Sequence, residues 1–141
     1  MSTQDFDTLA AGDALPGRAV ESDRERLVAY AAFSGDRNRI HWDEAYASEV
    51  GLPGVIAHGM FTMASAAAMV EDWAGPRAYV AEYRTKFVDL VPVPYQGTAT
   101  VDVAGVVKSV DAEARSALVE LTVKFGEAKV LGNARLTVRW L

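Results

Sequence analysis

A long apolar stretch in the middle of the chain constrains the fold more than any other feature of the sequence. Residues 59–73 read Gly-Met-Phe-Thr-Met-Ala-Ser-Ala-Ala-Ala-Met-Val-Glu-Asp-Trp, which predicts a helix that is apolar on nearly all sides. Such a helix has to be buried. The small residues at 64–68 allow another layer, most simply a β-sheet, to approach the helix axis closely, and Gly75-Pro76 is expected to end the helix.

The chain changes character after residue 77. Four segments rich in β-branched and aromatic residues predict strands, at 78–91, 97–110, 116–125 and 129–141. A buried helix followed by a four-strand antiparallel meander predicts an α+β fold in which the sheet curls around the helix. All 141 residues are expected to form a single domain.

The segment before the long helix is expected to contain loops and two shorter helices. Pro16-Gly17 predicts a turn within residues 6–19, which leave room for at most one edge strand and little order. Ser22 is the expected N-cap of a helix that stops at Ser34-Gly35-Asp36, because glycine favours the left-handed conformation at a helix C-terminus. A second helix is predicted for residues 43–50.

Composition excludes several classes of protein. The chain has no cysteine, so disulfides, thiolate metal sites and cysteine nucleophiles are ruled out. A net charge of -5 argues against broad nucleic-acid binding. No apolar run approaches the roughly 20 residues of a membrane span. The first seven residues lack the basic and apolar regions of a secretory signal, so a cytoplasmic location is expected.

The residues that carry chemistry lie on the loop after the first predicted helix. Asp36 and His41 stand five residues apart around a Gly-Asp turn. A carboxylic acid and an imidazole in one pocket can move protons at neutral pH without a metal, a cofactor or a covalent intermediate. Asn38 can fix the loop through backbone hydrogen bonds, and Ile40 with Trp42 offers apolar walls. On spacing alone, an ordinary turn aspartate and loop histidine are the commoner interpretation.

His58 and Gly59 stand at the start of the long helix. A structural interpretation makes them a capping histidine and a closely packed glycine. A functional interpretation uses the free backbone N–H groups of the helix start and the helix dipole to bind a carbonyl oxygen that becomes negative during reaction. Gly59 would then donate its N–H, and its missing side chain would let the substrate approach.

Other site chemistries find less support in the sequence. Ser34, Ser48 and Ser65 lie outside any Gly-x-Ser-x-Gly elbow, which disfavours a serine nucleophile. The two histidines and Asp36 lack the clustered helical spacing of many metal sites, so no metal is expected. Arg37 and Arg39 flank Asn38. They are either solvated or positioned for an anion, such as a phosphopantetheine phosphate, an acidic carrier protein or a substrate carboxylate.

Three blocks of the sequence carry a family resemblance. The main block is Phe33-Ser34-Gly35-Asp36-Arg37-Asn38-Arg39-Ile40-His41, and it is accompanied by residues 56–60 and 83–94. These blocks resemble the MaoC-like, or R-specific hydratase 2, family, whose signature runs from an aromatic residue to Ser/Thr-Gly-Asp-x-Asn-Pro-aliphatic-His. The chain looks most similar to single-hot-dog dehydratases of (3R)-hydroxyacyl thioesters, including the B-type catalytic subunit of the carrier-protein dehydratase of mycolic-acid synthesis.

The resemblance implies a hot-dog fold that forms dimers, with substrate channels near the interface. It implies reversible syn addition of water to a trans-2-enoyl thioester, giving the (3R)-3-hydroxyacyl product. Asp36 and His41 match the catalytic pair, the Gly59 amide matches the group that binds the thioester carbonyl, and Asn38 matches the loop asparagine. No cofactor is implied, because the thioester itself activates the substrate. Ile40, His58 and Arg39 are expected to contact the substrate.

One departure from the family pattern leaves alternatives open. Arg39 stands where the family usually has proline, so a rigid φ is replaced by a long cation. The substrate is expected to be a thioester of CoA or of an acyl carrier protein, and the assembly a homodimer or a heterodimer with another hot-dog subunit. A hot-dog thioesterase, or an acyl-binding subunit that is inert or depends on a partner, remains an alternative function.

Overall fold

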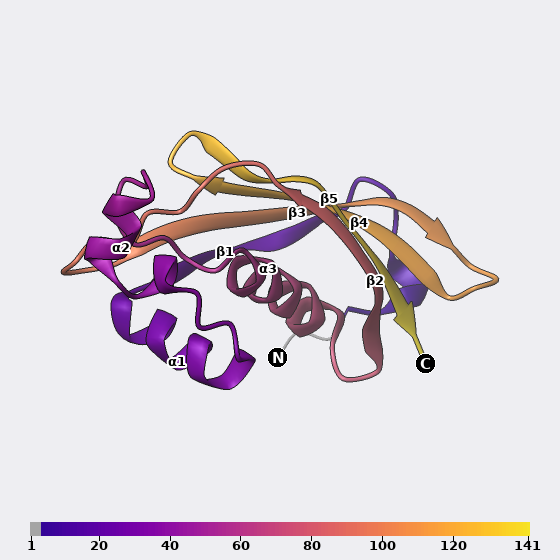
Figure 1. The fold of residues 1–141 in the computed structure, drawn as a ribbon. Helices are drawn as coiled ribbons and strands as arrows, with labels where there is room; N and C mark the ends of the chain where they lie inside the picture. Colours follow the sequence, from indigo (N-terminus) through magenta and orange to yellow (C-terminus); the bar gives the residue numbers. More distant parts are fainter. Residues whose placement is uncertain (1–3) are drawn as a thin grey trace.

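Five antiparallel strands form a single curved sheet in the computed structural model, which describes residues 4–141 (Figure 1). The strands are β1 (Ala14–Ser22), β2 (Ala78–Phe87), β3 (Ala99–Asp111), β4 (Ser116–Phe125) and β5 (Ala128–Trp140). Their spatial order is β1-β3-β4-β5-β2, with β1 and β2 at the two edges. Residues 1–3 lie outside the described residues. They belong to the N-terminal segment from which the absence of a secretory signal was predicted.

The predicted four-strand meander is wrong at its first strand. β3, β4 and β5 follow one another through short turns, but β2 pairs with β5 at the far edge of the sheet instead of with β3. The connection after β2 is long and does not form a hairpin. Two backbone hydrogen bonds join it to the segment before the long helix: Ala57 N–H donates to Val91 O, and Val93 N–H donates to Val55 O. This connection therefore crosses from one edge of the sheet toward the other.

The opening segment is more ordered than the sequence indicated. β1 runs through Pro16-Gly17 and pairs with β3, with a shift of register between Leu15 and Arg18. Proline donates no backbone hydrogen bond, and it is tolerated in a sheet at an edge strand or a bulge. The Pro-Gly pair therefore marks an edge-strand irregularity rather than a turn.

The residues that the structure describes also form three α-helices and two short 3-10 helices: η1 (Phe6–Thr8), α1 (Arg24–Ser34), η2 (Arg39–His41), α2 (Glu44–Glu49) and α3 (Gly59–Ala74). The predicted N-cap of α1 was off by one residue. Asp23 caps the helix by accepting a bond from the Arg26 N–H at 2.7 Å, and Ser22 is the last residue of β1. The predicted stop is confirmed, because Gly35 ends α1 in the left-handed conformation with φ 80°.

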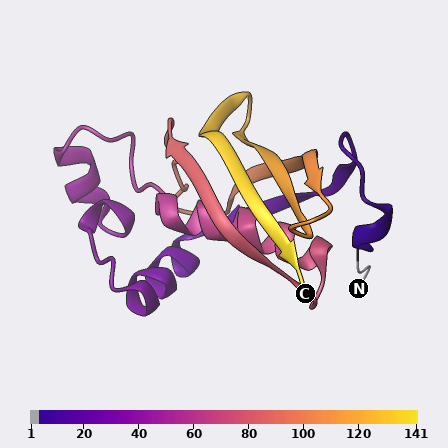
Figure 2. The ribbon, with the colours of Figure 1, turned by 90° about the vertical axis from the view of Figure 1, so that its right-hand side faces the viewer.

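α3 packs against the concave face of the sheet, as Figures 1 and 2 show from two directions. Its buried residues are Thr62, Ala66, Met69, Val70 and Ala74. The prediction that this helix is buried is confirmed for one side only within the single chain, because Met60, Ala64 and Ala68 on another face are exposed. The sheet, being one layer, covers one side of the helix.

α1, η2 and α2 gather at one end of the sheet, beside the start of α3 (Figure 2). This arrangement brings the loop after α1 close to the first turn of α3. Among residues 4–141, no helix is both long enough and apolar enough to cross a membrane.

Candidate active site

A cavity of about 230 Å³ opens at the start of α3. It brings Asp36 and His41 together with Gly59, three residues that the sequence singled out. The rest of its lining is mostly apolar and comes from α3 and the segment before it, from the end of β2 and the connection that follows, and from β5: Ile56, Ala57, Met60, Thr62, Phe87, Asp89, Leu90, Val91, Val130 and Leu131. The cavity is mostly apolar, and its wall also holds a carboxyl group and an imidazole.

The loop that presents Asp36 is built by local hydrogen bonds. The left-handed Gly35 turns the chain out of α1, and the Asp36 N–H then donates to Ser34 Oγ at 3.1 Å. Asn38 caps η2, since its Oδ1 accepts from the Ile40 N–H at 3.2 Å, and its own N–H donates to Asp36 Oδ1 at 3.3 Å. These bonds hold the carboxylate on a short loop directly before the histidine.

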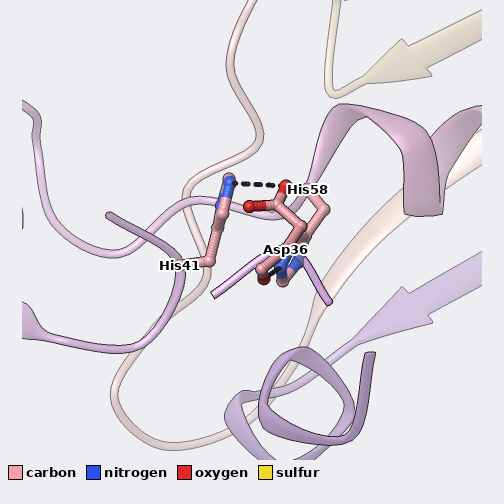
Figure 3. Close-up of side chains that lie close together, drawn as sticks. All are labelled: Asp36, His41 and His58. Carbon is pink, nitrogen blue, oxygen red and sulfur yellow. Dashed lines mark hydrogen bonds and ion pairs between the residues drawn. The ribbon is translucent and has the colours of Figure 1, made fainter. Parts of the chain in front are cut away.

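His41 is buried and its tautomer is fixed by the backbone. Its Nδ1 lies 2.8 Å from the carbonyl oxygen of Ile56. A carbonyl can only accept, so Nδ1 carries the proton and donates it. The neutral ring therefore keeps a lone pair on Nε2, which lies 3.8 Å from Asp36 Oδ2 (Figure 3). The histidine therefore presents its Nε2 to a half-exposed carboxyl group.

Gly59 is the first residue of α3, where the N–H has no partner within the helix. The positive end of the helix dipole adds to the attraction of this N–H for a negative oxygen. A Cβ atom on Gly59 would lie 2.8 Å from Cδ1 of Phe87, closer than real contacts allow. The approach of an aromatic ring therefore requires glycine at this position, and the same bare backbone is open to the cavity.

His58 is fully buried and does not line the cavity, although the sequence suggested that it contacts substrate. Its ring stacks on His41 with the centroids 3.8 Å apart, and its Nε2 lies 3.1 Å from the carbonyl oxygen of Asp36. Burial lowers the pKa of His58 below the ordinary histidine value, and this outweighs the bond to Asp36. His58 thus packs against His41 and the Asp36 loop and lies outside the cavity lining.

Arg39, Asn38 and Ile40 also lie outside the lining of the cavity. The Arg39 guanidinium donates to Asp43 Oδ2 from Nε at 3.0 Å and from Nη2 at 2.6 Å, and it lies over the ring of Tyr46. Those bonds hold the pKa of Asp43 below its usual range and raise that of Arg39. The expectation that Arg39 contacts substrate does not fit this position, and no arginine or lysine is among the described lining residues.

Asp36, His41 and His58 each place a possible ligand atom within 4.8 Å of the others, which makes them a candidate metal site. One nitrogen of each histidine is already used, by Ile56 and by Asp36. The remaining lone pair of each histidine lies in the plane of its ring, and the planes of the two stacked rings are 22° apart with centroids at 3.8 Å. Lone pairs in two stacked, nearly parallel planes do not converge on one ion about 2.1 Å from both nitrogens. The arrangement suits proton transfer better than metal binding.

Sequence reasoning missed Thr62, Phe87 and Asp89, which all line the cavity. Thr62 lies three residues after Gly59 in α3, so helical spacing could have placed the two on one face. Phe87 and Asp89 come from the end of β2 and from the connection after it. The predicted meander paired β2 with β3, so these two residues were not expected near the start of α3. Their location depended on the topology rather than on a local motif.

The sheet wrapped around α3 defines a hot-dog fold, and the loop at the start of this helix carries a carboxyl group beside an imidazole. The sequence model of the protein family described as "MaoC like domain" matches residues 9–125, and the chain belongs to the MaoC-like family.

Two curated relatives contain a similar segment. "Fatty acid synthase subunit beta" of Saccharomyces cerevisiae is 47% identical over 64 residues, covering 44% of this chain and 3% of that protein. "3-hydroxyacyl-thioester dehydratase X" of Mycobacterium tuberculosis is 48% identical over 46 residues, covering 33% of this chain and 16% of that protein. This chain therefore corresponds to a small part of these relatives.

Solved structures extend the likeness to the whole fold. A "MaoC-like dehydratase" matches with a TM-score of 0.91 and 37% identity, over 99% of this chain and 43% of that chain. The ChsH1-ChsH2 complex of Mycobacterium tuberculosis matches with a TM-score of 0.81 and 19% identity, over 94% of this chain and 98% of that chain. At that identity the likeness shows the fold alone.

Proposed function

We propose that this chain is a hydro-lyase that interconverts trans-2-enoyl and (3R)-3-hydroxyacyl thioesters. The observation that carries the proposal is the grouping of Asp36, His41 and Gly59 at one cavity. His41 Nε2 and Asp36 Oδ2 lie 3.8 Å apart, and Gly59, whose N–H has no partner within α3, lines the same cavity. Family membership and the dehydratase relatives support the same reaction class.

Dehydration follows from these positions as two proton transfers. His41 Nε2 removes the C2 proton, and the electron pair moves onto the thioester carbonyl oxygen. As the pair returns to form the C2–C3 double bond, the C3–O bond breaks and Asp36 protonates the leaving hydroxyl, which departs as water. The proton held by His41 then returns to Asp36 across the short gap, directly or through one water. Hydration uses the same groups in reverse.

Gly59 stabilises the charge that develops on the thioester oxygen. Its N–H points out of the helix start, where the dipole favours negative charge. Loss of one such donor in an oxyanion hole costs roughly 3 kcal/mol of transition-state stabilisation. The thioester supplies the remaining activation, so the proposed reaction needs no cofactor.

The lining of the cavity favours a neutral acyl chain. The walls are mostly aliphatic and aromatic, and the second carboxylate in the lining, Asp89, would repel an anionic acyl group. Arg39 is held by Asp43 outside the cavity, which disfavours its selection of a carboxylated substrate. The thioester is proposed to arrive as a conjugate of CoA or of an acyl carrier protein.

A second hot-dog subunit is proposed to complete the site. Met60, Phe87 and Leu90 line the cavity yet are 53%, 54% and 41% exposed, so its mouth has an uncovered apolar rim. β2, which ends at Phe87, is an edge strand with an unpaired side. A partner subunit that covers this rim, whether a copy of this chain or a different hot-dog protein, would shield the reacting thioester from water.

The proposal is tested with a panel of enoyl and (3R)-hydroxyacyl thioesters on CoA and on carrier protein, incubated with the pure chain and analysed by mass spectrometry. A gain or loss of 18 mass units on an intact thioester, roughly the mass of water, is expected, with only the (3R) isomer reacting. Release of free thiol without a change in enoyl absorbance would identify a thioesterase instead. A chain that is inert alone and active with a companion hot-dog protein would identify a partner-dependent subunit.

A further inference from the structure

His58 is the N-cap of α3, but its side chain makes no capping bond. N-caps are usually Ser, Thr, Asp or Asn, whose short side chains accept bonds from the first turn. The His58 ring is fully buried, which is costly for a polar side chain unless its polar atoms find partners. The capping position therefore does not explain the presence of a histidine.

The contacts of the ring explain it better. Its Nε2 lies 3.1 Å from the Asp36 carbonyl oxygen, which can only accept, so Nε2 carries the proton. One face stacks on His41 at 3.8 Å, and Tyr30 packs against the ring edge-on at 4.7 Å. A single side chain thus holds the backbone of the acid and supports the ring of the base, as the cluster in Figure 3 shows.

The other nitrogen has a different environment. Nδ1 carries the lone pair and has no hydrogen-bond partner in the described chain. The titratable groups that face the ring are Tyr30 from α1, Asp36 from the loop and His41 from η2. The Asp36 carboxylate faces His41, so a proton on Nδ1 would place an unpaired cation in a buried site. Burial accordingly lowers the pKa of His58.

We propose that His58 is a neutral positioning residue, which ties the Asp36 loop to the start of α3 and supports the His41 ring without exchanging a proton with the substrate. Only Asp36 and His41 then exchange protons with substrate. The catalytic meaning of this inference rests on the proposed hydratase function. The protonation state and the tautomer of His58 do not depend on it.

The tautomer is tested by NMR on the tag-free protein. The chain has two histidines, so a His58→Gln variant assigns both sets of ring ¹⁵N signals. The expected result is a neutral His58 with the proton on Nε2, retained at pH values below about 6.5, where a free histidine becomes protonated. A proton on Nδ1, or protonation of His58 at or above that pH, would overturn the inference.

Two variants separate the two contacts of the ring. Gln can still donate an N–H toward the Asp36 carbonyl but has no ring to stack, whereas Phe keeps the flat ring and loses the donor. Each is expected to lower kcat, on the order of 10²-fold if a catalytic group moves by about 1 Å. KM should change little, because His58 does not touch the cavity. The His58→Gln pH–rate profile should keep the same number of ionisations as the wild type.

The outcomes of this experiment are distinct. Wild-type kcat in both variants would overturn the positioning role, and a raised KM with unchanged kcat would make His58 a substrate-binding residue. Loss of one ionisation from the pH–rate profile would make it a proton carrier, which also contradicts the inference. If no thioester is turned over by the wild type, the proposed function fails, and the NMR measurement still decides the state of His58.

Discussion

At the scale of single residues, the site depends on contacts that fix one tautomer, one side-chain position and one bare stretch of backbone. The Ile56 carbonyl holds the proton of His41 on Nδ1, so the lone pair of the neutral ring faces Asp36. Asp43 holds the Arg39 guanidinium outside the cavity. Phe87 leaves no space for a side chain on residue 59. Each of these constraints keeps one donor, acceptor or surface free for a substrate.

Gly59→Ala is expected to reduce both stability and activity. The new Cβ would meet Phe87 at 2.8 Å, and such overpacking costs about 1–3 kcal/mol. The displaced groups should also lower kcat/KM on the order of 10²-fold, since misplacing a reacting carbonyl by about 1 Å has that effect. Thermal melts and steady-state kinetics measure the two losses.

A double variant separates the two effects of Gly59→Ala. Phe87→Ala in that background removes the clash, so part of the stability should return. Because Phe87 lines the cavity, the reference for activity is Phe87→Ala alone, and the double variant should be less active than this single variant, since the methyl group on residue 59 stands where the thioester is proposed to approach. Full activity of Gly59→Ala would contradict the role of this backbone.

His58 is expected to make stability depend on pH. Because burial lowers its pKa in the folded state, the unfolded chain binds a proton that the folded chain does not once the pH falls below about 6.5. The stabilisation is therefore complete above that pH and is lost as the pH falls through the folded-state pKa. Urea denaturation of wild type and His58→Gln over this range should show a steeper loss in the wild type. Parallel profiles would contradict a neutral buried His58.

At the scale of elements, the site is assembled by the ends of helices. α1 ends at the left-handed Gly35, which delivers Asp36, and α3 begins at Gly59, which delivers the open N–H. η2 lies between them in the sequence and carries His41. The chemistry therefore depends on where helices stop and start rather than on their faces.

Gly35→Ala is expected to cost about 1–2 kcal/mol, the penalty of the left-handed conformation for a residue with a Cβ. No atom lies within 4 Å of the added methyl group, so the backbone alone accounts for the loss. Gly35→Asn is the matched control, because asparagine tolerates this conformation better. Chemical denaturation should rank the proteins as wild type, then Asn, then Ala. Equal stability of Ala and wild type would contradict this account of the loop.

Local signals in the sequence predicted most elements. The bounds of β4 and the end of α1 match the structure, and α3 differs by one residue at its end. The pairing of β2 with β5 could not be predicted, because it depends on contacts of residues 91 and 93 with residues 55 and 57, far away in the sequence. The side-chain partner of Arg39 was missed although Asp43 stands four residues later, because η2 had not been foreseen.

The candidate site was predictable in part. Asp36, His41 and Gly59 were found from residue chemistry and the family resemblance, and the structure gathers them at one cavity. Whether His58, Asn38, Ile40 and Arg39 face that cavity depended on side-chain direction, which the sequence pattern does not encode. The structure places all four outside its lining.

At the scale of the whole molecule, the single chain leaves two sheet edges and one apolar helix face uncovered. β1 and β2 are both sheet edges, and α3 has an exposed apolar face at Met60, Ala64 and Ala68. Open edges and apolar faces of this kind favour association. Met60 on this helix face and Phe87 at the end of β2 also line the cavity, so a partner bound there would lie beside it.

The active form is expected to contain at least two subunits. Light scattering coupled to size-exclusion chromatography should give a mass at least twice that of the chain, either for the protein alone or after addition of the companion subunit that activates it. Activity should follow the assembled fraction as the protein is diluted. A fully active monomer would contradict the proposal that a partner covers the cavity mouth.

The central claim is that Asp36 and His41 add and remove water at a thioester. The most direct measurement is the loss of enoyl absorbance when crotonyl-CoA, or the best enoyl thioester of the panel, is incubated with wild type, Asp36→Asn and His41→Ala at matched folding and assembly. Wild type should hydrate the substrate, and each variant should lose at least about 10²-fold in rate, as expected for removal of a general acid or base. Wild-type activity in either folded variant would contradict the account.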